Sequence, residues 1–259
     1  MPNGKYRILT RRHLAAALAL LFLAAVLMIV AAAAIPYAYA NAVAAARQKR
    51  PICCTDRADR VVSVTFDAVR GDGDIRELVD VLAQYGVKAT FFVTGEWVER
   101  CADEAKALHD AGHEVMNHSD THLSMAGLSR ADAIREISAC SDKIQAVTGE
   151  RPALFRAPRG DYDDALIETA EMLGMSCIQW DVESRDGLSA EERAREVLSR
   201  VSSGSIVRFR AGGENTAQAL AAVLRSLQNE GYRFLTVSEM IYTENYTVNQ
   251  EGRQISLED

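Results

Sequence analysis

Three features are missing from this sequence, and each absence excludes a class of protein. No glycine-rich phosphate loop follows the first predicted strand, residues 61–66, which argues against a dinucleotide-binding fold. The formal net charge is −7 and the basic residues cluster in residues 41–60, which argues against nucleic acid as a partner. The five cysteines have the spacing of neither a zinc ribbon nor an obvious disulfide framework, although Cys101 and Cys140 could pair across two predicted helices.

The first forty residues, 1–40, carry a long hydrophobic run. Four basic residues precede an unbroken apolar stretch over residues 14–35. That stretch reaches the roughly 20 residues of a membrane-spanning helix, and it exceeds the usual core of about 7–15 residues in a cleaved signal peptide. Residues 38–40 (AYA) nevertheless match a cleavage site, so a long cleaved signal remains an alternative to an uncleaved signal anchor. In both cases the basic flank stays inside, and we expect the rest of the chain outside the cytoplasm, membrane-anchored or secreted.

The body of the chain alternates short β-branched runs with amphipathic helices. Helical periodicity is clear in residues 74–85 and 215–230. Regular alternation of this kind predicts parallel β-α-β units, and seven of them favour an α/β fold with a closed or nearly closed (β/α) barrel of about seven parallel strands. We expect a polar stalk over 41–60, this domain over 61–243 and a loosely attached polar tail over 244–259. The predicted strands are 61–66, 88–93, 113–117, 153–156, 175–181, 205–209 and 233–237.

Polar side chains stand where successive predicted strands end. Barrel enzymes keep their active sites at the carboxyl ends of the parallel strands. We therefore expect one site to collect the residues found at five such ends: Asp67, His118, Arg156, Trp180 with Asp181, and Arg210.

Two histidines form the most distinctive part of this set. His118 and His122 are four residues apart in a polar loop, and neutral histidine is the commonest metal ligand in proteins. On one helical turn, such a pair can direct two ring nitrogens at the same ion. We therefore predict that both imidazoles and Asp67 converge on a single cation at the mouth of the barrel.

Several motifs resemble those of a known family. Residues 65–67 (TFD), 117–122 (NHSDTH) and 156–160 (RAPRG) resemble three successive motifs of the NodB-homology polysaccharide deacetylases, carbohydrate esterase family four. Residues 88–93 and 112–115 resemble the framework of that family, and the resemblance extends over about 61–242. It implies a distorted barrel with a divalent metal, commonly zinc. It also implies hydrolysis of N-acetyl groups on peptidoglycan or a chitin-like glycan.

The resemblance also implies a role for each matching residue. A metal on His118 and His122 would lower the pKa of bound water and polarise the acetyl carbonyl. Asp67 would act as general base, and Arg156 would keep it ionised and oriented. Trp180 would form a wall of the acetyl pocket. Further catalytic or substrate-binding positions carried over from the motifs are Pro158, Arg159, Gly160, Asp186 and Arg210.

Three positions depart from the family pattern. Ala68 replaces the second aspartate of the usual metal site, so zinc binding is expected to be weakened unless Asp67 rotates or Asp72 or Asp74 contributes. Arg210 replaces the histidine that protonates the leaving amine, and a guanidinium cannot release a proton at neutral pH. The motif that contains Asp186 lacks its tryptophan. General acid catalysis contributes about 10²–10⁴-fold to a rate, so these residues are compatible with a slow enzyme, and a fast one that uses the usual mechanism is not expected.

Three functions are compatible with these residues. The first is a membrane-tethered, metal-dependent N-deacetylase of cell-wall glycan with attenuated activity. The second is a pseudoenzyme that binds the glycan but has lost the chemistry. The third is an O-acetyl esterase, because an alcohol leaves more readily than an amine and needs an acid less. The run over residues 67–71 is also similar to a spore-associated subgroup of the family that lacks the second aspartate.

Overall fold

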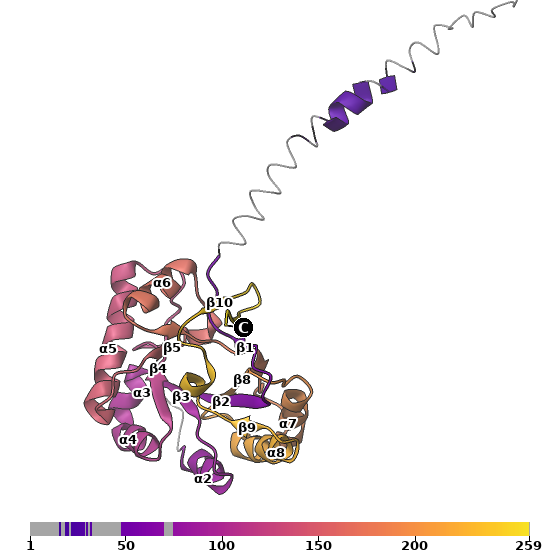
Figure 1. Cartoon of the computed structure of the whole chain (residues 1–259). Helices are drawn as coiled ribbons and strands as arrows, with labels where there is room; N and C mark the ends of the chain where they lie inside the picture. Colours follow the sequence, from indigo (N-terminus) through magenta and orange to yellow (C-terminus); the bar gives the residue numbers. More distant parts are fainter. Residues whose placement is uncertain are drawn as a thin grey trace, which may run out of the picture. The chain divides into compact units, whose positions relative to one another are not determined.

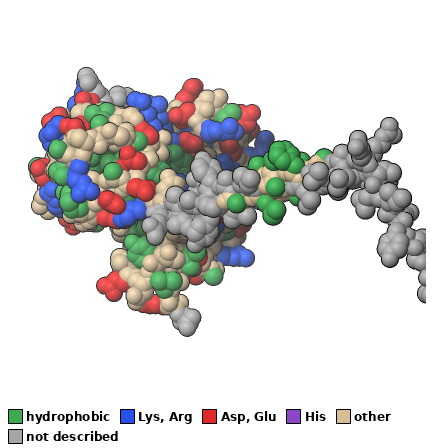
Figure 2. Space-filling model, turned by 90° about the horizontal axis from the view of Figure 1, so that it is seen from above, with side chains coloured by type: hydrophobic (Ala, Val, Ile, Leu, Met, Phe, Trp, Pro, Cys, Tyr) green, Lys and Arg blue, Asp and Glu red, His purple; other side chains and the backbone are tan. Residues whose placement is uncertain are grey.

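The computed structural model describes residues 48–69 and 75–258, together with residues 16, 19–20, 22–28, 30 and 32. The chain forms two units, Met1–Gln48 and Lys49–Asp259. In the first unit, residues 22–28 are helical, and Phe22 and Met28 are among their exposed large apolar side chains. Figure 2 shows apolar side chains on the surface of this segment. No helix within the described residues is long and apolar enough to cross a membrane. The predicted run 14–35 lies partly outside the described residues, so the signal anchor stays a prediction.

A sheet of largely parallel strands forms the centre of the second unit (Figure 1). Parallel neighbours follow one another in the order β8, β2, β3, β4, β5 and β6, while β7 adds to β8 and β9 adds to β2. All seven predicted strands are present, and β7 was not predicted. Their bounds are β2 (Val61–Ala68), β3 (Thr90–Val93), β4 (Glu114–Asn117), β5 (Leu154–Phe155), β6 (Ser176–Cys177), β7 (Val182–Glu183), β8 (Ser205–Arg210) and β9 (Arg233–Phe234).

Three more strands make the sheet mixed. β1 (Cys54–Thr55) pairs antiparallel with β8 and parallel with β11 (Arg253–Ser256), which pairs antiparallel with β10 (Tyr246–Val248). A further bridge joins Ile52 to Ile178, just beyond β6. The segment before β1 therefore lies between the two sides of the curved sheet. The α/β class is confirmed, but the fold is a half-barrel with mixed strands and not an all-parallel barrel.

The two outer parts of the predicted domain organisation differ from the structure. In the predicted stalk 41–60, Ile52 and Cys54 are only 4% and 5% exposed, because this segment pairs with the sheet. In the predicted loose tail 244–259, the side chain of Gln254 is buried and makes two hydrogen bonds to the backbone of Tyr242. Polar composition was misleading here because backbone pairing and side-chain hydrogen bonds, and not apolar periodicity, attach both segments.

The helices lie mainly around the outside of the sheet, with α3 to α6 on one side and α7 and α8 on the other (Figure 1). Phe66 and the neighbouring strand residues Phe91 and Phe209 stack in the core at centroid distances of 4.7 and 5.6 Å. All five cysteines are free, so Cys101 and Cys140 do not form a disulfide. The helices are α2 (Arg76–Gln84), α3 (Gly95–Arg100), α4 (Ala102–Asp110), α5 (Arg130–Thr148), α6 (Asp164–Met172), α7 (Ala190–Leu198), α8 (Thr216–Asn229) and α9 (Val237–Met240).

Candidate active site

Asp67 is a buried carboxylate near the end of β2, and it is 3% exposed. Its Oδ1 accepts a hydrogen bond from Arg156 Nη1 at 2.8 Å, and its Oδ2 accepts one from Arg208 Nε at 2.5 Å. Burial alone would raise the pKa of Asp67, but the electrostatic interactions with Arg156, His118 and Arg208 and the hydrogen bond from Arg156 lower it far below its ordinary value. The carboxylate is therefore ionised, and a guanidinium contacts each of its oxygens.

Arg156 fixes Asp67 from inside the protein. It follows β5, is fully buried, and also donates from Nη1 to Thr65 Oγ1 at 2.9 Å and from Nη2 to the Gln179 carbonyl at 3.1 Å. Its guanidinium carbon lies 3.9 Å from the centre of the Phe92 ring. The predicted pairing of Arg156 with Asp67 is present in the structure.

Arg208 covers Asp67 from the solvent side, a contact that the sequence did not suggest. The Arg208 side chain is 21% exposed, against 4% for Asp67. Its Nη1 also donates to Glu183 on β7, and its guanidinium carbon lies 4.4 Å from the Trp180 ring centre. Glu183 and Trp180 therefore hold this guanidinium against the carboxylate that was predicted to be the general base.

Strand geometry explains why Arg208, and not Arg210, contacts Asp67. In the β2–β8 pair, Arg210 lies level with Asp67, and Arg208 lies level with Thr65. Alternate residues of a strand face the same side, so the long Arg208 side chain extends along the strand to the carboxylate, whereas Arg210 at the strand end is exposed. The alternating Arg208-Phe209-Arg210 run was the available signal, because a strand directs both of its arginines to one face.

The two predicted histidines are close together after β4. His118 is buried, and its Nδ1 lies 2.8 Å from the Arg156 carbonyl. That contact assigns the proton to Nδ1 and leaves the Nε2 lone pair 3.8 Å from Asp67 Oδ2. Burial lowers the pKa of His118 to about 4, so the ring is neutral at pH 7. The half-buried His122 ring lies 5.1 Å from the His118 ring, centre to centre.

The pair lies in a loop, as its polar sequence indicated. Ser119 and His122 both have left-handed backbones, with φ of 65° and 58°. Asn117 Oδ1 accepts from the Ser119 amide, and Ser119 Oγ accepts from the His122 amide. Gly95 is needed beside this loop because a Cβ there would lie 1.8 Å from Asp120 Oδ1. The predicted polar loop is therefore confirmed, and the helical turn that the spacing would also allow is not formed.

The predicted substrate-binding residues form one wall beside Trp180. The short helix η1 (Pro158–Gly160) follows Arg156, with Pro158 buried and Arg159 exposed. A Cβ at Gly160 would lie 3.3 Å from the Trp180 ring. Arg159 and Arg210 are close enough to the histidine loop that their charges lower the pKa of His122, after the larger effect of burial.

Asp186 lies at the edge of this cluster. Its Oδ1 is 3.4 Å from Nη2 of the buried Arg193, and its charge also acts on Arg208. Within the described residues, no hydrogen bond or ion pair joins Asp186 to either arginine that contacts Asp67. No contact in this part of the structure supports the predicted catalytic role of Asp186, because its side chain faces Arg193.

The residues present do not fit the metal that the resemblance implies. The 3.8 Å between His118 Nε2 and Asp67 Oδ2 is a separation that two ligands of one zinc ion can have. That same Oδ2, however, already accepts from Arg208. Across residues 48–69 and 75–258, no three His, Cys, Asp or Glu side chains are grouped to hold an ion. The predicted alternative ligands Asp72 and Asp74 lie outside the described residues.

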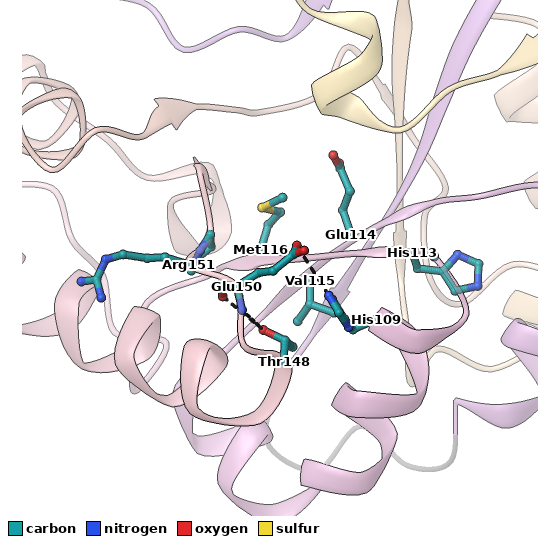
Figure 3. A pocket seen from close by; sticks show the side chains of 10 residues that line it. His109, His113, Glu114, Val115, Met116, Thr148, Glu150 and Arg151 are labelled. Carbon is teal, nitrogen blue, oxygen red and sulfur yellow. Dashed lines mark hydrogen bonds and ion pairs between the residues drawn. The ribbon is translucent and has the colours of Figure 1, made fainter.

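A separate pocket of about 350 Å³ lies at the other end of β4 (Figure 3). Glu114, the first residue of β4, contributes to its lining, whereas His118 follows the last residue of that strand. His109 Nε2 lies 3.5 Å from Glu150 Oε2 across the pocket. None of the predicted site residues lines this pocket, which is therefore distinct from the Asp67 cluster.

Comparisons with known proteins agree with the fold and the motifs. The family model "Polysaccharide deacetylase" matches residues 55–178. A peptidoglycan-N-acetylglucosamine deacetylase of Bacillus cereus is 32% identical over 190 residues, which cover 71% of this chain and 89% of the relative. The chain therefore belongs to the polysaccharide deacetylase family.

Solved structures with the same fold include proteins without activity. Wild-type BA3943 of Bacillus anthracis, a CE4 family pseudoenzyme, has a TM-score of 0.71 and 26% identity, covering 79% of this chain and 72% of that one. A BA3943 mutant with restored enzymatic activity also has a TM-score of 0.71, with 29% identity over 73% of this chain and 70% of that one. The family thus contains enzymes and pseudoenzymes, and the spore-associated subgroup remains a prediction for this chain.

Proposed function

We propose that this protein binds a cell-wall glycan of the peptidoglycan type through a deacetylase fold and does not hydrolyse its N-acetyl groups. The observation that carries the proposal is the environment of Asp67, whose two carboxylate oxygens accept from Arg156 and Arg208. Of the two partners, Arg208 is the one that reaches the surface, with 21% of its side chain exposed. A water molecule and an acetyl group would have to displace that guanidinium to reach the expected base.

Amide hydrolysis needs a base, an electrophilic centre and an acid, and this site is deficient in each. A carboxylate whose pKa lies far below its ordinary value has little tendency to accept a proton. Ala68 supplies no metal ligand. Arg210 stands where an acid is expected, and a guanidinium does not donate a proton at neutral pH. These substitutions together favour binding over the attenuated deacetylase that the motifs alone predicted.

Glycan binding is supported by what the site retains. The half-buried Trp180 ring and the neighbouring η1 segment persist beside the modified centre. Of the proteins named above, one is a peptidoglycan-N-acetylglucosamine deacetylase, and another is a pseudoenzyme of the same family. An aromatic ring beside hydrogen-bond donors is a common arrangement for a ligand with one apolar face and several polar groups.

We also propose that the domain lies outside the cytoplasm, attached through the N-terminal apolar run or released after its cleavage. The basic flank and the run 14–35 support this orientation, as do the exposed apolar side chains of the helical residues 22–28. Protease accessibility in intact cells, compared with cells made permeable, tests the orientation.

The function is tested by measuring binding and acetate release on the same sample. The full chain, purified in mild detergent, is titrated with N-acetylglucosamine oligomers and with isolated peptidoglycan. We expect binding without acetate release, and weaker binding for Trp180→Ala than for the matched Trp180→Phe, which keeps an aromatic ring. Chelator-sensitive acetate release that disappears in Asp67→Asn would instead establish the deacetylase. Release from O-acetylated substrates alone would establish the esterase.

A further inference from the structure

We propose that the guanidinium of Arg208 takes the place of the family's metal ion, as an internal cation built into the chain that excludes a divalent ion from the site. The inference deepens the proposed function, because it identifies the residue that converts the centre from hydrolysis to binding. It is tested by metal titration, whereas the proposed function is tested by glycan binding, so either can fail without the other.

One oxygen atom carries the argument. Asp67 Oδ2 lies 2.5 Å from Arg208 Nε and 3.8 Å from His118 Nε2. Nε2 is the nitrogen that remains free for a metal, because Nδ1 contacts the Arg156 carbonyl. A metal bound between Nε2 and Oδ2 would therefore have to share that oxygen with a fixed positive charge. The Arg208 guanidinium already provides a positive charge for Asp67 Oδ2.

Arg208 is held in this position by more than Asp67. Glu183 accepts a hydrogen bond from its Nη1, and its guanidinium carbon lies 4.4 Å from the centre of the Trp180 ring. Arginine suits such a place because its planar guanidinium stays charged, pairs with carboxylates and stacks on aromatic rings. The side chain comes from the middle of a paired strand, β8, so its backbone is also fixed. A dication would need to break all of these contacts to enter.

Further arginines increase the positive charge around the histidines. Arg156 contacts the opposite oxygen of Asp67, while Arg159 and Arg210 act electrostatically on His122. Against these four arginines, the described acidic side chains that contact the cluster are Asp67 and Glu183, and Asp186 lies at its edge. The local field therefore disfavours a dication even where two imidazoles are suitably close.

The test is to remove this guanidinium and to measure metal binding directly. The full chain in mild detergent is titrated with Zn²⁺ by calorimetry, and with Co²⁺ by visible absorption of the bound ion. We expect Arg208→Leu to bind Zn²⁺ about 10–100-fold more tightly than the unmodified chain. The matched control is Arg210→Leu, which removes the same charge two residues along the same strand and should raise the affinity far less, because it leaves the hydrogen bond from Arg208 to Asp67 in place.

Two further variants make the result decisive. Arg208→Leu combined with His118→Ala should lose the gained affinity if the ion binds where we infer. If the leucine variant fails to fold, Arg208→Gln replaces it in the metal titration, because glutamine removes the charge and keeps a polar side chain. The inference is overturned if the unmodified chain already binds Zn²⁺ as tightly as the Arg208 variants. It is equally overturned if the folded variants show no gain, or if Arg210→Leu gains as much.

Discussion

Arg208 Nε donates to Asp67 Oδ2 at 2.5 Å, on the solvent side of a carboxylate whose other oxygen accepts from Arg156 at 2.8 Å. The two arginines differ in their surroundings. Arg156 has no exposed side-chain surface, and Arg208 is 21% exposed. Arg156 therefore stabilises the buried charge, whereas Arg208 controls access to it. Each contribution can be measured separately.

Replacing Arg156 by leucine should destabilise the fold strongly. Asp67 would stay buried with one of its two partners missing, and removing one member of a buried ion pair costs about 3–5 kcal/mol. Urea unfolding followed by circular dichroism measures the free energy of unfolding. Arg210→Leu, at an exposed strand end, is the matched control and should change it by less than about 1 kcal/mol. Equal losses in both variants would contradict the structural role of Arg156.

Restoring the acid alone should not restore hydrolysis. Arg210→His leaves Arg208 in contact with Asp67, so we expect no acetate release from N-acetylglucosamine oligomers. The triple variant Ala68→Asp, Arg208→Leu, Arg210→His should show zinc-dependent release. The double variant that keeps Arg210 should be about 10²–10⁴-fold slower, because it lacks only the proton donor. Activity of Arg210→His by itself would show that Arg208 does not block the site.

Stability should fall as the pH decreases from 6.5 towards 4. Burial lowers the pKa of His113 and of His118 from 6.5 to about 4 in the folded protein. In that window the unfolded chain binds more protons than the folded one, so acid favours unfolding. Each histidine should cost about 3 kcal/mol across the whole window. This loss of stability is zero above pH 6.5 and reaches its full value below pH 4.

The cleanest measurement uses His113, which lies away from the Asp67 cluster. Its Nδ1 accepts a hydrogen bond from the Ala89 amide, and protonation of that nitrogen would remove the acceptor. The free energy of unfolding of His113→Gln should depend less steeply on pH between 4 and 6.5 than that of the unmodified protein. Parallel curves for the two proteins would refute this assignment.

Deletion of the predicted stalk should unfold the domain. A chain that begins at residue 61 lacks Ile52 and β1, which pair with both sides of the sheet. Two buried apolar side chains would be lost, each worth about 1.5–3 kcal/mol, and two strand edges would be exposed. A chain that begins at residue 48 should keep a cooperative thermal transition. A stable, cooperatively melting chain from residue 61 would restore the original domain boundary.

Much of the fold could be predicted because the signals are local. β-branched runs and helical periodicity identified all seven predicted strands and helices such as α8. The segments that were missed carry no such signal. β10 and β11 are polar, and β1 has two residues, so their pairing partners and not their own sequence determine their structure. Long-range pairing of this kind is not visible in a single sequence.

The candidate site divides in the same way. Strand ends and motif spacing alone are sufficient to identify Asp67, Arg156, His118 and His122 as neighbours, because parallel strands bring their carboxyl ends to one edge. Only the tertiary structure shows that Arg208 reaches Asp67 while Arg210 lies at the exposed strand end. That choice depends on the β2–β8 register and on the length of an arginine side chain, which together place a positive charge two residues beyond its own backbone position.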